Sequence, residues 1–122
     1  MLRTGVDIVD HEGFARRDER TKNDWKAAFL TAEELAEVGS SIPRSAGRWA
    51  AKEAVMKALG RGIGAVDPRD IEVVVVDDLP TVTLHRGARD RAAELGLTDW
   101  SLSVSHTDNY TVAFVVAAGG TS

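Results

Sequence analysis

The stretch from Arg48 to Gly60 constrains the fold more than any other part of the chain. It is rich in Ala, Leu, Met, Lys and Glu, which favour helices, and its final glycine is a typical helix stop. Trp49, Glu53 and Lys57 are spaced four residues apart, so they share one face of the predicted helix. A carboxylate one turn before a lysine permits two interpretations: a surface ion pair, or a metal ligand beside a cation that binds phosphate.

The composition is that of a small protein with one core. The chain has 122 residues, of which 43% are hydrophobic, and this is enough for a single domain. It contains no apolar run of the length that a membrane span needs, and its first residues lack the apolar segment of a signal peptide. Cysteine is absent, which excludes disulfides and thiolate zinc sites, so we expect a cytoplasmic protein. The net charge of −4 argues against general nucleic-acid binding.

The remaining segments predict strands and helices that alternate along the chain. We expect strands over 2–10, 71–76, 81–85, 100–106 and 110–116. We expect helices over 11–22 and 87–96, and a further helix that begins at the capping box formed by Thr31 and Glu34. Residues 77–80 should form the turn of a hairpin, and the apolar side chains Trp25, Phe29, Leu30 and Leu35 are assigned to the core. The pattern predicts an α+β fold in which short antiparallel strands pack around the long central helix.

Two local patterns look like known motifs but fail on context. Residues 60–65 match the G-x-G-x-x-A pattern of dinucleotide-binding proteins, but they follow a helix where that motif follows a strand. Glycines in such a loop still leave backbone amides that can lie against phosphates. Ser105 and His106 are neighbours on a strand, point to opposite faces and cannot form a nucleophile–base pair.

Asp7 lies in an apolar strand, where a carboxylate needs a partner unless it sits at the strand end or edge.

Three segments in this order closely resemble the holo-acyl-carrier-protein synthases, the small trimeric class of 4′-phosphopantetheinyl transferases. They are Gly5–Val9, Ala46–Ile63 and Leu102–Thr107, and Phe29–Leu35 resembles the family's sequence before the central helix. The likeness covers nearly the whole chain, and its central motif is long and specific. It implies a single phosphopantetheinyl transferase domain over residues 1–118, a flexible tail over 119–122, and a homotrimer with active sites at the subunit boundaries.

The resemblance also implies a reaction. Such enzymes transfer 4′-phosphopantetheine from coenzyme A to a serine of an apo acyl carrier protein, for fatty-acid or polyketide-type biosynthesis, and release adenosine 3′,5′-bisphosphate. By match to the family motif, Asp7 and Glu53 are the Mg²⁺ ligands and Lys57 lies beside the pyrophosphate, so these three form the catalytic set. The implied contacts to coenzyme A are Arg48, Lys57, Gly60, Pro80, Ser105, His106 and Thr107.

The chain departs from the family pattern at two places. Leu79-Pro80 stands where the family has a Gly-x-Pro turn near the adenine, without the usual glycine and basic residue. The arginine that the family has after the first aspartate is also absent, because residues 11–14 read His-Glu-Gly-Phe. Arg16, Arg17 and Arg20 follow instead, and since the family's carrier proteins are acidic, this basic helix is the expected docking surface.

Elementary chemistry agrees with these roles but leaves choices open. Mg²⁺ prefers carboxylate and phosphate oxygens, and a lysine one turn beyond Glu53 can stabilise charge on a phosphate. The serine proton can pass to Glu53 itself or to a metal-bound water. A non-catalytic module that binds coenzyme A or a carrier protein, and a metal-dependent nucleotide pyrophosphatase, are the competing classes. The native carrier, the accepted acyl variants and the subunit that supplies each contact are left undetermined. Trp49 is assigned to packing that holds the helix in place.

Overall fold

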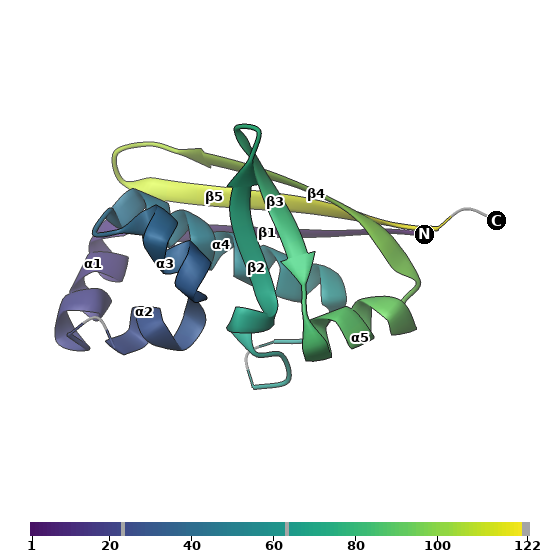
Figure 1. Cartoon of the computed structure of the whole chain (residues 1–122). Helices are drawn as coiled ribbons and strands as arrows, with labels where there is room; N and C mark the ends of the chain where they lie inside the picture. The colour runs from purple at the N-terminus through teal and green to yellow at the C-terminus, as the bar shows by residue number, and fades with distance from the viewer. Residues whose placement is uncertain (23, 63, 121–122) are drawn as a thin grey trace.

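The computed structural model describes residues 1–22, 24–62 and 64–120 and places helices on one side of a sheet (Figure 1). In chain order, the elements are β1 (Leu2–Asp10), α1 (His11–Arg20), α2 (Asp24–Phe29), α3 (Ala32–Val38), α4 (Ile42–Leu59), the short 3₁₀ helix η1 (Pro68–Asp70), β2 (Ile71–Val76), β3 (Leu79–Leu84), α5 (Arg86–Glu94), β4 (Leu97–His106) and β5 (Tyr110–Gly119). Within the described ranges, no helix combines the length and apolar character that crossing a membrane requires.

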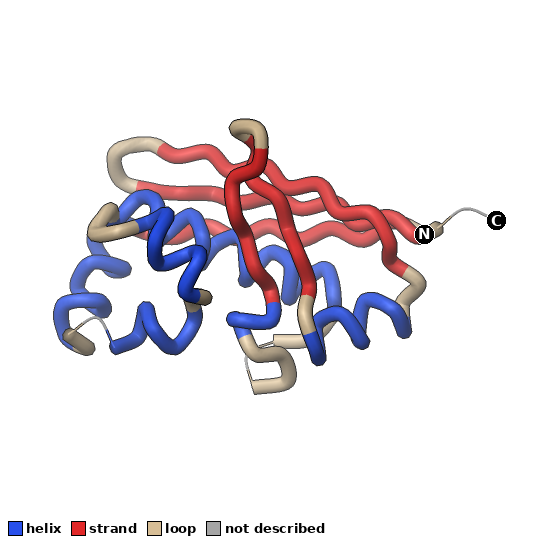
Figure 2. Tube along the Cα trace, in the orientation of Figure 1, coloured by secondary structure: helices blue, strands red, loops and turns tan. Residues whose placement is uncertain are grey.

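The main sheet has three antiparallel strands in the order β1-β5-β4. Its strands are nine or ten residues long, and the helices lie against one of its faces (Figure 2). Strand β5 pairs with both neighbours, with Val6 of β1 and Ser103 of β4 opposite Phe114. Side chains alternate between the two faces along each strand, so Ala113, Val115 and Ala117 are buried beneath the helices.

Helix α4 packs directly against this sheet because the residues of both elements are small where they meet. A Cβ atom at Gly5 would lie 1.8 Å from the carbonyl oxygen of Ala54, so only glycine allows β1 and α4 to approach this closely. The helix begins after the Ser41 cap, with Pro43 in its first turn, and ends at Gly60, whose φ of 68° is left-handed. Its buried alanines are Ala46, Ala50, Ala51, Ala54 and Ala58.

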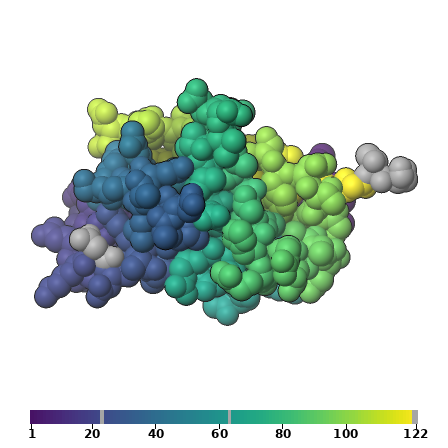
Figure 3. Space-filling view, viewed as in Figure 1, coloured from purple at the N-terminus to yellow at the C-terminus, as the bar shows by residue number. Residues whose placement is uncertain are grey.

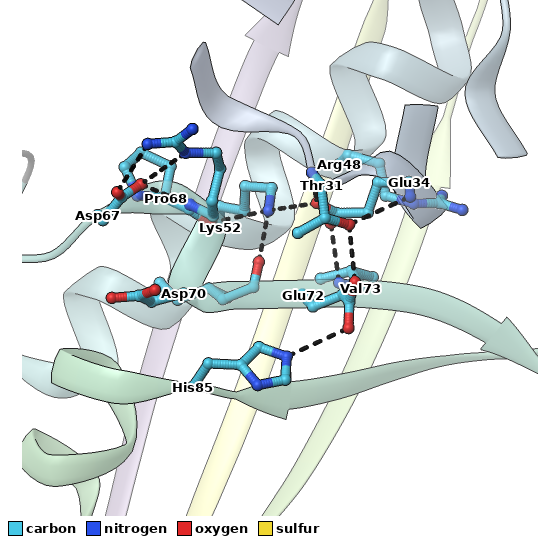
Figure 4. A network of polar contacts seen from close by, with 12 residues as sticks. Thr31, Glu34, Arg48, Lys52, Asp67, Pro68, Asp70, Glu72, Val73 and His85 are labelled. Atoms are coloured by element: carbon cyan, nitrogen blue, oxygen red, sulfur yellow. Dashed lines mark hydrogen bonds and ion pairs between the residues drawn. The ribbon is translucent and has the colours of Figure 1, made fainter. Parts of the chain in front are cut away.

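A buried ion pair fastens α4 to the helix and strand on its other side (Figure 4). Lys52 and Glu34 are both fully buried, and Lys52 Nζ lies 2.8 Å from Glu34 Oε1. The same ammonium donates to the carbonyls of Pro68, at 2.9 Å, and Ile71. Glu34 in turn accepts from the backbone N–H of Val73 at 2.8 Å. Burial lowers the pKa of Lys52, and the Glu34 carboxylate opposes that shift.

The second sheet is the β2–β3 hairpin, which crosses over the helical side of the molecule between α3 and α5 (Figure 3). The predicted turn over 77–80 is wrong in extent, since Leu79 and Pro80 already belong to β3. Only Asp77 and Asp78 form the turn, with φ of 51° and 63°. A two-residue hairpin turn of this kind needs positive φ at both positions, and proline is tolerated in an outer strand.

The other sequence-based expectations for the fold are largely confirmed. The α+β class, the strand over 2–10, the Thr31–Glu34 capping box and the pairing of the last two strands are present. The main strands are longer than expected, and Leu35 is exposed although it was assigned to the core. Strand β5 reaches Gly119, which is one residue into the predicted tail. The backbone N–H of Gly119 donates to the Met1 carbonyl at 2.9 Å and so extends the strand. Residues 121–122 of that tail lie outside the described ranges.

Candidate active site

Asp7, Glu53 and Lys57 meet where β1 crosses α4. Gly5 brings the strand against the helix, and Asp7, two residues further on, faces the same side of the sheet. Lys57 Nζ donates to the Val6 carbonyl at 2.8 Å and lies 3.4 Å from Asp7 Oδ1. The structure therefore brings the three predicted catalytic residues together from two elements that are distant in sequence.

The two carboxylates are held in surroundings that disfavour their charge. Burial raises the pKa of Asp7, although Lys57 partly opposes this rise. Burial also raises the pKa of Glu53, and the nearby negative charge of Asp7 raises it further, against the opposing charges of Lys57 and Arg17. Glu53 Oε1 is buried and has no hydrogen-bond partner among the described residues. The protein thus compensates this pair of negative charges only in part.

This pair fits the requirements of a magnesium ion. In the described part of the chain, no three His, Cys, Asp or Glu side chains come together as a metal-binding group. A closed site of the zinc type is therefore not formed there. Mg²⁺ is usually bound through one or two carboxylates while substrate phosphates and waters fill its other positions. Asp7 and the unpartnered oxygen of Glu53 supply that number and type of ligand.

Two pockets adjoin Glu53, one on each side. The first has a volume of about 420 Å³, and its lining includes Asp7, Glu53, Arg17, Trp25 and Trp49. The second has a volume of about 350 Å³ and is lined by Glu53, Met56, Lys57, Gly60, Arg61 and Gly62. Gly60, predicted as a contact to coenzyme A, thus lies beside Lys57 in the second pocket.

The remaining predicted contacts to coenzyme A lie elsewhere. Arg48 forms an ion pair with Glu37 at 2.5 Å, and Pro80 lies in the β2–β3 hairpin. Ser105, His106 and Thr107 line a separate hollow of about 240 Å³ at the end of the sheet. None of these five lines either of the two pockets that adjoin Glu53, and among the described residues none forms a hydrogen bond with Asp7, Glu53 or Lys57. One copy of the chain therefore holds the predicted site in separate parts.

The three predicted docking arginines of α1 have different surroundings. Arg16 is exposed and pairs with Glu12 at 2.7 Å, and Arg20 is exposed on the same helix. The guanidinium carbon of Arg17 instead lies 4.0 Å from the ring centroid of Trp25. It therefore lines the first pocket together with the two carboxylates.

Trp25 and Trp49 have a second role that the sequence did not reveal. Both were assigned to packing, and they do pack edge-on at 5.1 Å and contact Phe29. They also form part of the wall of the carboxylate pocket. The sequence did contain a signal for this arrangement, since Phe14 and Arg17 are three residues apart and share a face of α1. An arginine beside the aromatic side chains was therefore predictable.

Comparison with known proteins decides the family. Residues 3–115 match the family model of the 4′-phosphopantetheinyl transferase superfamily. The chain is 39% identical to the holo-[acyl-carrier-protein] synthase of Herpetosiphon aurantiacus, over 98% of this chain and 100% of that protein. The chain belongs to the 4′-phosphopantetheinyl transferase superfamily. It is a transferase of that family, as its sequence motifs indicated.

Solved structures agree with the family of this transferase. The holo-[acyl-carrier-protein] synthase of Neisseria meningitidis superposes with a TM-score of 0.88 at 34% identity, covering 97% of this chain and 99% of that one. The Helicobacter pylori enzyme, solved in complex with coenzyme A, gives a TM-score of 0.85 at 28% identity, covering 94% and 99%. The α+β fold expected from the resemblance is thereby confirmed.

We expect Glu53→Gln to stabilise the transferase in metal-free buffer. The pKa of Glu53 is raised in the folded state, so the folded chain keeps this proton to a higher pH than the unfolded chain does. Stability therefore falls as pH rises through that interval, and the neutral glutamine avoids the loss. In EDTA at neutral pH, calorimetry should show a higher melting temperature for Glu53→Gln than for the wild type.

Added Mg²⁺ should raise the melting temperature of the wild type and leave that of Glu53→Gln almost unchanged. Glu33→Gln, on the exposed side of α3, is the matched control and should respond to Mg²⁺ like the wild type. A wild type more stable than Glu53→Gln in EDTA would show that the charge of Glu53 is compensated by the protein. Equal Mg²⁺ shifts in both would show that Glu53 is not a metal ligand.

Proposed function

We propose that this transferase moves 4′-phosphopantetheine from coenzyme A to a serine of an apo acyl carrier protein, using Mg²⁺ held by Asp7 and Glu53. The observation that carries the proposal is the partly compensated carboxylate pair, placed beside Lys57 and between two pockets. The names of the relatives, and the coenzyme A complex of one of them, support the same substrates. The product that leaves is adenosine 3′,5′-bisphosphate.

The protein assists this reaction mainly by compensating the charge of the phosphates, and less by covalent chemistry of its own. The serine oxygen attacks the phosphorus that carries pantetheine, and the bond from this phosphorus to the bridging oxygen breaks. Bound Mg²⁺ supplies neutralisation of the phosphate charge. Glu53, with its raised pKa and unpartnered oxygen, takes the serine proton directly or through a water that it holds.

Lys57 controls the charge of the leaving group. Its ammonium donates to the Val6 carbonyl, which fixes its position at the edge of the pocket that Gly60 and Arg61 line. From there it donates to a phosphate oxygen of the leaving bisphosphate and stabilises the negative charge that develops as the bond breaks. The exposed arginines Arg16 and Arg20 provide a basic surface for an acidic carrier, and their attraction weakens with salt.

The intact mass of a carrier protein tests this function. After incubation with coenzyme A, Mg²⁺ and the transferase, an apo carrier should gain the mass of one phosphopantetheine group. Glu53→Ala should abolish the gain while its circular dichroism stays that of the wild type. Breakdown of coenzyme A that EDTA stops, without a mass gain on several carriers, would favour a nucleotide pyrophosphatase. Coenzyme A binding without either reaction would favour a non-catalytic module.

We propose further that the transferase works as a homotrimer. The sheet face turned away from the helices exposes large apolar side chains, including Val6 (51% exposed), Ile8 (65%) and Phe114 (45%). An apolar patch of this kind on the outside of a chain is typical of an interface. Ile8 also lines the hollow of Ser105, His106 and Thr107, so assembly through this face brings these predicted contacts to a subunit boundary.

Light scattering tests the assembly. The wild type should have three times the mass of the chain, and Ile8→Glu should give monomers because it places a charge on the exposed apolar face. These monomers should lose carrier modification although Asp7, Glu53 and Lys57 are intact. Ala36→Glu, on the exposed side of α3, should remain a trimer. A wild type that is fully active as a monomer would overturn the proposal.

A further inference from the structure

Arg17 is held in place by stacking. Its guanidinium carbon lies 4.0 Å from the centroid of Trp25 and 5.9 Å from that of Trp49. The two indoles are themselves packed against each other at 5.1 Å, so the platform under the arginine is rigid. Stacking on an indole face attracts a guanidinium and leaves the N–H groups at its edge available.

These N–H groups have no acceptor in the described part of the chain. Arg16, its neighbour, donates from one terminal nitrogen to Glu12, and Arg48 donates from one terminal nitrogen to Glu37. Arg17 forms neither an ion pair with Glu53 nor one with Asp7, although all three line the same pocket. Its positive charge partly opposes the rise in the pKa of Glu53 that burial causes. A fixed fork of free donors beside a metal-type site is suited to an anion.

Arg17 and Lys57 lie on opposite sides of Glu53. Arg17 lines the pocket of about 420 Å³ with Asp7 and the tryptophans, whereas Lys57 lines the pocket of about 350 Å³ with Gly60. Glu53 belongs to both pockets, so a phosphate group held near its carboxylate by a divalent cation has Arg17 in one adjoining pocket and Lys57 in the other. A pyrophosphate carries charge on two phosphoryl groups, and two separated cations match that distribution.

We propose that Arg17 is a substrate-binding residue of the transfer, donating hydrogen bonds to the coenzyme A pyrophosphate from the side opposite Lys57. This inference rests on the proposed function and removes Arg17 from the carrier-docking surface, which Arg16 and Arg20 then form. A docking arginine acts mainly on the encounter with the carrier and on its salt dependence. A phosphate-binding arginine acts on coenzyme A binding and on the chemical step.

Two measurements separate these roles. Calorimetry of coenzyme A binding in Mg²⁺, without any carrier, should show about tenfold weaker binding for Arg17→Gln than for the wild type. In steady-state kinetics, the same variant should lower kcat by roughly 100-fold and leave the carrier KM nearly unchanged. Arg17→Lys keeps the charge but loses the planar fork, so it should restore only part of both losses.

Arg16→Gln is the matched contrast, because Arg16 is the preceding residue on the same helix and is exposed like Arg17, but it pairs with Glu12 and does not line the carboxylate pocket. It should raise the carrier KM and leave coenzyme A affinity as in the wild type. Equal coenzyme A affinity in Arg17→Gln and the wild type would overturn the inference, whether or not transfer occurs. An Arg17→Gln variant whose only defect is a raised carrier KM would also overturn it. Absence of any transfer by the wild type would instead count against the proposed function, and the calorimetry would still decide the role of Arg17.

Discussion

The buried contact between Lys52 and Glu34 is the constraint on which the site depends. Both side chains are fully inside the protein, and removing one partner of such a pair costs about 3–5 kcal/mol because the other charge is left buried and unpaired. The contact ties α4 to α3, and the same ammonium binds carbonyls at Pro68 and Ile71. The next residue along α4 is Glu53, which points about 100° further around the helix, into the site. Anchoring Lys52 therefore fixes the position of Glu53, and of Lys57 one turn later, against β1.

Glu34 of the buried network and Glu53 of the candidate site differ in a way that separates structure from function. Glu34 accepts hydrogen bonds from Lys52 and from the N–H groups of Thr31 and Val73 (Figure 4). Glu53 keeps a buried oxygen without a partner and shares its surroundings with Asp7. A satisfied buried charge holds elements together, whereas an unsatisfied one is retained where a ligand completes it. Arg48 forms an ion pair with Glu37, whereas Arg17 is stacked on Trp25 and has no acceptor among the described residues.

The sequence predicted what depends on local spacing and on the family motif. Asp7, Glu53 and Lys57 were identified in this way, and the capping box of Thr31 needed only four residues. The burial of Lys52 was not predictable locally, because a lysine on a helix usually faces solvent and its partners come from three other segments. The orientation of Arg17 depends on Trp25 and Trp49, which come from two other helices. Pro80 was assigned to a turn because proline favours turns, but an outer strand accepts it as well.

The central claim is that Asp7 and Glu53 hold a divalent cation against the pyrophosphate of coenzyme A. A crystal grown with coenzyme A and Mn²⁺ in place of Mg²⁺ tests it most directly, since manganese is located by its anomalous scattering. We predict one manganese bound by both carboxylates and by phosphate oxygens, with Lys57 on one side of the phosphates and Arg17 on the other. Ordered coenzyme A with the manganese bound to other residues, or with its phosphates away from Glu53, would contradict it.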